Sequence, residues 1–262
     1  MLNRLKGLIA LVRVRHTGQV IGIVSILSLK RTGFSFQSLV PIASFLFLSI
    51  ALFAFDDAHD YKSDVQNHPN RPIPKGVLTS NQVYIIGISA LGAGLVAAMS
   101  LALHQLLLFL LVAFLGFLVI FLKLSSLIRA ALIGLMMFLL FPFGISIGVK
   151  STLFGLIVAL PHIAGTIAKD FIHSKGDENI GLQPPSPWTK HLASFLFFIS
   201  GGIILFPIML SLVTWWYTLL IIPTLTSCLF LGFKVIRSQY DKVYIYGGVG
   251  MVSVLLAFAT SI

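Results

Sequence analysis

The feature that most constrains this chain is a succession of apolar segments, each close to the ~20 residues that a helix needs to cross a bilayer. Of the 262 residues, 57% are hydrophobic and only 10% are charged. A soluble domain averages about 25% charged residues, so most of this surface cannot face water. The sequence therefore predicts an all-α, polytopic membrane protein in which residues 1–262 form a single domain.

Hydropathy indicates nine transmembrane helices in one bundle, and a short amphipathic helix on the membrane surface ahead of them, at residues 5–12. The nine predicted spans are residues 17–33, 36–55, 83–103, 106–122, 130–149, 151–168, 192–213, 214–233 and 243–262. The first span has a short uninterrupted apolar part, and Lys30 and Arg31 lie near its end.

The basic residues predict the orientation of these spans. Of the 18 lysines and arginines, only Lys30, Arg31 and Lys150 fall on the side opposite the N-terminus. Cytoplasmic loops carry the excess of positive charge, so we expect the N-terminus inside and the C-terminus outside. The net charge of +10 is spread over short loops. It therefore does not indicate a nucleic-acid partner.

Seven of the eight acidic residues form two clusters, each at the cytoplasmic end of a predicted span. The cluster after the second span contains Asp56, Asp57, Asp60 and Asp64. The cluster after the sixth span contains Asp170, Asp177 and Glu178. Ionisable residues at membrane depth are functional candidates by default, and we expect an Asp-rich cavity that opens to the cytoplasm.

The spacing of these acids favours a metal site. Steps of three and four residues place carboxylates near one face of a helix, where their mutual repulsion is relieved by a divalent cation. Oxygen ligands suit magnesium, manganese or calcium rather than zinc. Asp170 and Asp177 are two turns apart, with His173 between them. The alternative, solvated acids neutralised by nearby lysines and arginines, leaves the double clustering unexplained.

A segment suited to phosphate follows the first cluster. Residues 70–76 read Asn-Arg-Pro-Ile-Pro-Lys-Gly. Arginine binds phosphate through a planar fork and lysine through a point charge, and the prolines stiffen the segment. Because magnesium is usually held by a few carboxylates plus substrate phosphates, the combination fits a metal-bound diphosphate.

These motifs resemble those of the UbiA superfamily of intramembrane prenyltransferases. The family pattern Asn/Asp-Asp-x-x-Asp-x-x-x-Asp, followed by Asn-Arg-Pro-Ile-Pro-x-Gly, is matched by residues 56–64 and 70–76. Its second pattern, Lys-Asp-x-x-Asp-x-x-Gly-Asp, is matched by residues 169–177. Asp56 stands where the family usually has Asn, and His173 stands where it has the middle aspartate.

The resemblance implies that magnesium, with manganese as the alternative, bridges the two motifs and holds a prenyl diphosphate. The implied metal ligands are Asp56, Asp57, Asp60, Asp64, Asp170 and Asp177, with Asp60, Asp64 and Asp170 central to catalysis. The expected diphosphate contacts are Arg71, Lys123, Lys169 and His173. Lys123 is equally explained as a lysine that sets topology. In this family, the region around Arg13, His16 and Gln19 takes part in recognition of the acceptor.

The implied enzyme is a prenyltransferase in the membrane, with a prenyl diphosphate and a hydrophobic acceptor as its partners. The acceptor stays open among an aromatic ring, a tetrapyrrole, a glycerol-lipid phosphate and a quinone precursor. The alternative is a membrane terpene cyclase that needs no acceptor. A transporter is less consistent with the sequence, since carrier sites usually lie near the midplane, and these acids cluster at one membrane face.

Overall fold

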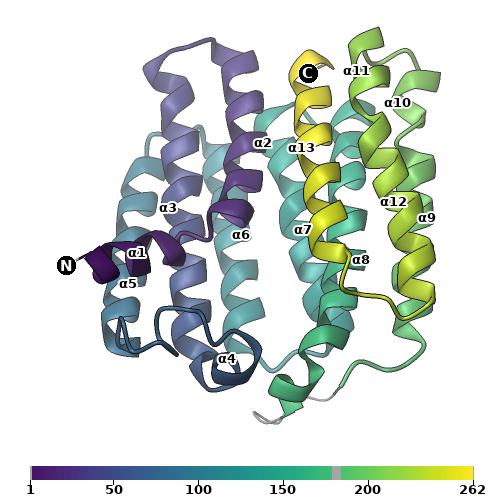
Figure 1. The fold of residues 1–262 in the computed structure, drawn as a ribbon. Coiled ribbons are helices and arrows are strands. Elements are labelled where there is room, and N and C mark those ends of the chain that lie inside the picture. Colours follow the sequence, from purple (N-terminus) through teal and green to yellow (C-terminus); the bar gives the residue numbers. More distant parts are fainter. Residues whose placement is uncertain (1, 179–183, 262) are drawn as a thin grey trace. The chain divides into compact units, whose positions relative to one another are not determined.

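A computed structural model describes residues 2–178 and 184–261, and all regular secondary structure in this part of the chain is helical (Figure 1). The helices are α1 (Leu2–Leu11), α2 (Val14–Thr32), α3 (Phe36–His59), α4 (Tyr61–Asn67), α5 (Ser80–Ala98), α6 (Leu103–Phe121), α7 (Ser126–Gly144), α8 (Val149–Glu178), α9 (Thr189–Ile203), α10 (Phe206–Met209), α11 (Trp215–Leu220), α12 (Ile222–Ile236) and α13 (Val243–Ser261). The all-α prediction is confirmed.

Eight segments of the described chain are long and apolar enough to cross a membrane. They are Phe36–His59, Ser80–Ala98, Leu103–Phe121, Ser126–Gly144, Val149–Ser174, Thr189–Met209, Trp215–Ile236 and Val243–Ser261. The protein is thus an integral, multi-pass membrane protein. The first predicted span forms helix α2 but is not among the eight, because Arg15, Lys30 and Arg31 charge both of its ends. The count of nine is therefore not confirmed.

The chain divides into two compact units, and the first runs to Lys123 and includes the end of α8 from Lys175. In the first unit, α3 is the central helix and packs against α2, α5 and α6. Helix α1 runs crosswise to them (Figure 1) and packs against α3. Leu11 of α1 is buried there with Ala54 and Ala58 of α3. This contact brings the start of α2 beside the acidic end of α3.

The second unit begins at Leu124 and contains most of α8 together with α7 and α9–α13. Its core joins five helices through the buried residues Ala130, Ala164, Ile167, Ala168, Ala193, Phe197, Leu231, Val235 and Val243. Several of these side chains are small, which lets helix backbones approach closely, as is usual in membrane bundles. That residues 1–262 act as a single domain stays a prediction.

Local capping explains where two of the helices begin. Thr79 and Gln82 form a capping box at the start of α5, with Gln82 N 3.3 Å from Thr79 Oγ1 and Thr79 N 3.0 Å from Gln82 Oε1. Gly76, at φ 67, supplies the left-handed residue just before it. Ser125 Oγ accepts from the backbone N of Ile128 at the start of α7. These caps fix the starts of α5 and α7.

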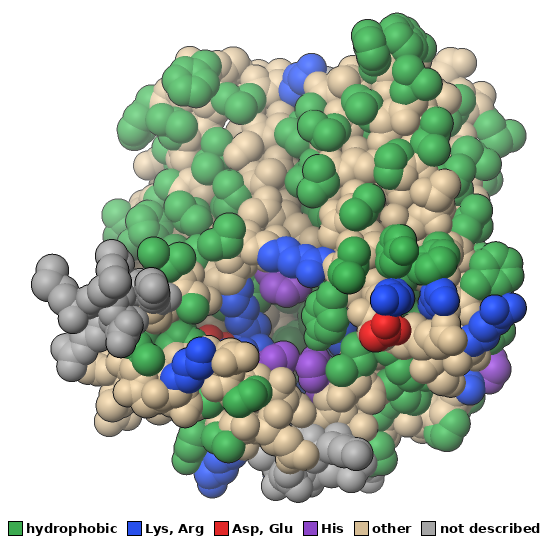
Figure 2. Space-filling view, in the orientation of Figure 1, with side chains coloured by type: hydrophobic (Ala, Val, Ile, Leu, Met, Phe, Trp, Pro, Cys, Tyr) green, Lys and Arg blue, Asp and Glu red, His purple; other side chains and the backbone are tan. Residues whose placement is uncertain are grey.

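Large apolar side chains are exposed along the spans, as Figure 2 shows for one face. On α5, for example, Ile85, Ile88 and Val96 are each more than 60% exposed. A soluble monomer rarely exposes such extensive apolar surface. Contact with lipid acyl chains explains it here.

Candidate functional site

The first acidic cluster lies where α3 passes into α4, in the first unit. Asp56 and Asp57 belong to the last turn of α3, Asp60 ends that helix, and Asp64 lies in α4. Helical hydrogen bonds continue through the junction, with Asp60 N 2.9 Å from Asp56 O and Asp64 N 3.0 Å from Asp60 O. The one-turn spacing read from the sequence therefore persists through the break between the two helices.

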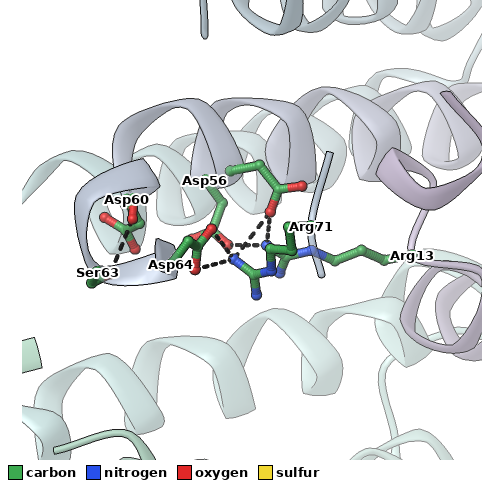
Figure 3. Close-up of polar contacts among 7 residues, drawn as sticks. Arg13, Asp56, Asp60, Ser63, Asp64 and Arg71 are labelled. Carbon is green, nitrogen blue, oxygen red and sulfur yellow. Dashed lines mark hydrogen bonds and ion pairs between the residues drawn. The ribbon is translucent and has the colours of Figure 1, made fainter. Parts of the chain in front are cut away.

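Two arginines bind these carboxylates (Figure 3). Arg13 Nη2 lies 2.6 Å from Asp56 Oδ2 and also contacts Asp57 Oδ1. Arg71 Nη1 lies 2.7 Å and 2.5 Å from the two carboxylate oxygens of Asp64, and 3.1 Å from Asp57 Oδ1. Asp57 is therefore paired with both guanidinium groups. Asp60 lies apart from the two arginines in Figure 3, and its backbone carbonyl accepts from Ser63 Oγ.

The turn of residues 70–76 directs Arg71 back toward α4. Lys75 N donates to Arg71 O, Gly76 N donates to Ile73 O and Val77 N donates to Pro72 O, all between 2.9 and 3.1 Å. These closed turns hold the arginine in place, as the prolines of the motif predict.

Burial makes the electrostatics of this cluster strong. The side chains of Asp57 and Asp64 are only 3% and 4% exposed. Burial raises the pKa of Asp64 to about 6, although Arg71 acts in the opposite direction. Burial also opposes the charge of Arg13, but Asp56 and Asp57 outweigh it and raise the pKa of Arg13. Buried charges of this kind are tolerated only when paired.

Arg13 is further held by its backbone and by an aromatic ring. It immediately precedes α2 and adopts a left-handed conformation, φ 44 and ψ 58, which is uncommon outside glycine. Its guanidinium carbon lies 4.9 Å from the centroid of the Phe53 ring, a cation–π contact. Its placement against the acidic motif was not anticipated, because sequence patterns do not connect residues this far apart.

The second motif lies on α8, with Asp170 and His173 in the second unit. Arg129 Nη2 of α7 lies 2.7 Å from Asp170 Oδ1, and Ser126 Oγ of the same helix contacts Asp170 Oδ2. His173 Nε2 lies 2.7 Å from Tyr244 Oη of α13. The side chains of Asp177 and Glu178 lie outside the described residues.

Arg129 and Tyr244 are also contacts that the sequence did not reveal. In the sequence, Arg129 was used only as one of the basic residues that predict orientation. A charged residue inside an apolar span is, however, a functional candidate by default. Tyr244 carried no signal. Lys123, a predicted diphosphate contact, is exposed just after α6, and the described contacts do not test its role.

The chemistry of the first cluster fits a divalent cation, since its donors are all carboxylate oxygens. Among the described side chains, no three His, Cys, Asp or Glu residues are arranged to hold a metal ion. The carboxylates of Asp56, Asp57 and Asp64 instead face guanidinium groups. The Asp-rich cavity stays a prediction.

A multi-pass helical membrane protein with buried, paired carboxylates and arginines at the end of a span belongs to the class of membrane proteins that carry a polar functional site. The sequence model of the UbiA prenyltransferase family matches residues 20–243 of this chain. The chain therefore belongs to this family and is a prenyltransferase. Members of the family generally use a divalent metal, a prenyl diphosphate and a lipophilic acceptor in the membrane.

Two solved structures share the fold. One is a digeranylgeranylglyceryl phosphate synthase, with a TM-score of 0.73, 23% identity and coverage of 98% of each chain. The other is a UbiA homolog from Aeropyrum pernix K1, with a TM-score of 0.73, 13% identity and coverage of 92% of this chain and 96% of that one. Among curated proteins, none matches this chain.

Proposed function

We propose that this protein transfers a prenyl group from a prenyl diphosphate to a lipophilic or polar-headed acceptor in a magnesium-dependent reaction. The observation that carries the proposal is the pair of buried carboxylates, Asp57 and Asp64, bound by Arg71 at the end of α3. Two buried acids and a phosphate-binding arginine supply the two kinds of group that a metal diphosphate requires.

The proposed metal ligands are Asp56, Asp57, Asp60 and Asp64 in the first motif, and Asp170 and Asp177 in the second. The proposed diphosphate contacts are Arg71, Lys123, Lys169 and His173. When bound, magnesium would neutralise the charge that develops on the departing diphosphate. We further propose that these groups face the cytoplasm and that residues 1–262 act as a single domain.

The chain's own residues would act by positioning and electrostatics. Arg71 already lies against the carboxylates, so its guanidinium is held where a diphosphate oxygen could replace one of them as its partner. Such preorganised charges stabilise a transition state without reorganisation at the moment of reaction. The prenyl carbon then becomes electron-poor as its C–O bond breaks, and the acceptor attacks it and loses a proton.

A glycerol-lipid phosphate is the acceptor class that we would test first, since a structurally similar chain is a digeranylgeranylglyceryl phosphate synthase. The cyclase alternative predicts a hydrocarbon or alcohol formed without any acceptor. One assay separates the two, because the mass of the product differs.

The experiment measures diphosphate release by the purified protein in detergent, with geranylgeranyl diphosphate, magnesium and candidate acceptors, and identifies products by mass spectrometry. Asp60→Asn and Asp64→Asn should each lower the rate at least about 100-fold, in the range seen when one charge-stabilising group is lost. Asp241→Asn is the matched control, because Asp241 is 68% exposed and pairs with Lys242. Release that persists in a chelator, or in both motif variants, would overturn the proposal.

A further inference from the structure

Two arginines converge on one oxygen atom of the first acidic cluster. Arg13 Nη2 and Arg71 Nη1 both contact Asp57 Oδ1, and the Arg71 contact is 3.1 Å long. Two guanidinium groups this close repel each other, so the backbone that carries each of them has to hold it in place. Arg71 also binds Asp64. Its contact with both carboxylates therefore depends on where the turn of residues 70–76 is held.

Helix α1 is fixed to the helix that carries the acids. Leu11, in the last turn of α1, is 1% exposed and packs in one buried cluster with residues of α3. The hydrogen bonding of α1 continues past Leu11, with Arg13 N 3.1 Å from Ala10 O. The Arg13 side chain then binds Asp57. Helix α1 is therefore a fixed surface relative to the carboxylates.

Gly7 is the point at which α1 meets the segment that carries Arg71. A Cβ added at Gly7 would lie 2.9 Å from Val77 Cγ1 and 3.7 Å from Pro72 Cβ, and Cβ atoms essentially never approach another atom as closely as the first of these distances. Pro72 directly follows Arg71, and its carbonyl accepts from Val77 N at 2.9 Å. The backbone of α1 thus lies against the residue next to Arg71, in a close approach of the kind that glycine allows.

We propose that Gly7 is a positioning residue for the diphosphate contact at Arg71. Because Gly7 has no side chain, the turn of residues 70–76 can close onto α1, and this closure holds the Arg71 guanidinium against Asp57 and Asp64. The inference rests on the proposed prenyl transfer, which supplies the diphosphate. It gives α1 a role in the site, whereas its sequence predicted only an amphipathic helix on the membrane surface.

The test measures the affinity of the purified protein in detergent for inorganic pyrophosphate with magnesium, by calorimetry. Gly7→Ala pushes Val77 away from α1. It should weaken pyrophosphate binding about tenfold, the effect of losing one hydrogen bond to a charged group. Gly92→Ala is the matched control, because Gly92 lies in α5 of the same unit and nothing lies within 4 Å of an added Cβ. The control should bind pyrophosphate as the wild type does.

A second substitution tests whether the contact itself is the cause. Val77→Ala removes Cγ1, and the atoms nearest to a Cβ at position 7 then lie 3.7 Å away, an ordinary van der Waals distance. The double variant Gly7→Ala/Val77→Ala should therefore recover the pyrophosphate affinity of Val77→Ala alone. A double variant that binds as weakly as Gly7→Ala would overturn the positioning role, and so would wild-type affinity in Gly7→Ala.

Melting temperature and turnover separate positioning from folding stability. Gly7→Ala should raise the KM for geranylgeranyl diphosphate along with the dissociation constant of pyrophosphate, at a temperature at which the variant is fully folded. A residue that only supports folding would lower the melting temperature and leave both constants of the folded protein unchanged. That result would overturn the proposal.

A double-mutant cycle distinguishes failure of this proposal from failure of the proposed function. If the wild type neither binds pyrophosphate nor forms a prenyl product, the proposed function fails, and the positioning role is decided by the cycle. The shift in melting temperature caused by Gly7→Ala should be smaller in an Arg71→Gln background than in the wild type, because the two residues act through one contact. The shift caused by Gly92→Ala should be the same in both backgrounds. Equal shifts for Gly7→Ala would overturn the positioning role.

Discussion

Arg13 donates a hydrogen bond to Asp57, although 44 residues separate them in the sequence. The contact joins the start of α2 to the last turn of α3, within the first unit. It places a guanidinium, which stays protonated and positively charged at any physiological pH, beside a carboxylate that is 3% exposed. Much of the positive charge that this acidic cluster needs is therefore built into the chain.

Replacing Arg13 should destabilise the metal-free protein and make it more responsive to magnesium. Arg13→Gln leaves Asp57 with Arg71 alone, at a cost of about 2 kcal/mol, below that of a fully buried broken pair because Arg13 is 18% exposed. Thermal unfolding in detergent measures this, with and without magnesium. Magnesium should raise the melting temperature of the variant more than that of the wild type.

The control for this prediction is Arg15→Gln, since Arg15 is exposed two residues further on. Identical melting temperatures for Arg13→Gln and Arg15→Gln in metal-free buffer would show that the Arg13 contacts contribute nothing to stability.

The Arg129–Asp170 pair of the second unit should be coupled in stability. Asp170 is 7% exposed, so Arg129→Met alone leaves a buried carboxylate without its charged partner and should cost about 3 kcal/mol. Asp170→Asn added to Arg129→Met should recover part of this loss, because the buried charge is gone. A double-mutant cycle from denaturant unfolding in metal-free buffer gives the coupling, with Arg237→Met as the exposed control. Strictly additive effects would contradict the prediction.

Close packing of α7 on α8 predicts that Gly134 tolerates no side chain. A Cβ at this position would lie 2.3 Å from Ile163 Cγ1, and a β-branched side chain in a helix has little rotamer freedom with which to move away. Gly134→Ala should therefore destabilise the protein by about 1–3 kcal/mol. Gly202→Ala, where nothing lies within 4 Å of the added Cβ, should have the ordinary small effect of glycine replacement in a helix. A melting temperature for Gly134→Ala at or above that of Gly202→Ala would refute this.

The number of spans is open to direct measurement, because α2 is as long as a span but carries charges at its ends. If α2 crosses the membrane and the N-terminus is inside, single cysteines at Val14 and Lys75 should be protected from an impermeant maleimide outside the cell. Cysteines at Phe34 and Ile147, which are 90% and 87% exposed, should be labelled. Each single cysteine is introduced into the Cys228→Ser variant, which removes the native, buried cysteine of the chain. Equal labelling at Val14 and Phe34 would mean that α2 does not cross.

Much of the fold follows from local sequence. The eight spans lie where apolar runs of bilayer length predict them, since hydropathy over about 20 residues is a property of the run itself. The interruptions of the helices between residues 192 and 233 were not predicted from the sequence. The predicted spans 192–213 and 214–233 each consist of two helices, α9 with α10 and α11 with α12. Pro207 and Pro223 stand at the second position of α10 and α12, where proline begins a helix without cost.

The acidic motifs were likewise predictable, because a repeat of three and four residues along a helix determines which side chains share a face. Asp56, Asp60 and Asp64 keep that one-turn spacing even where α3 gives way to α4. For residues 70–76 the sequence predicted only a segment stiffened by its prolines, and the structure forms it into closed turns.

The tertiary structure alone decided what these side chains contact. Arg13 meets Asp56 and Asp57, Arg129 meets Asp170, and Tyr244 meets His173 across 71 residues of sequence. Each pair joins two segments that are far apart in the sequence, so it depends on how the helices of those segments pack and rotate against one another. Local periodicity determines the face on which a side chain lies, but the packing of the helices determines its partner.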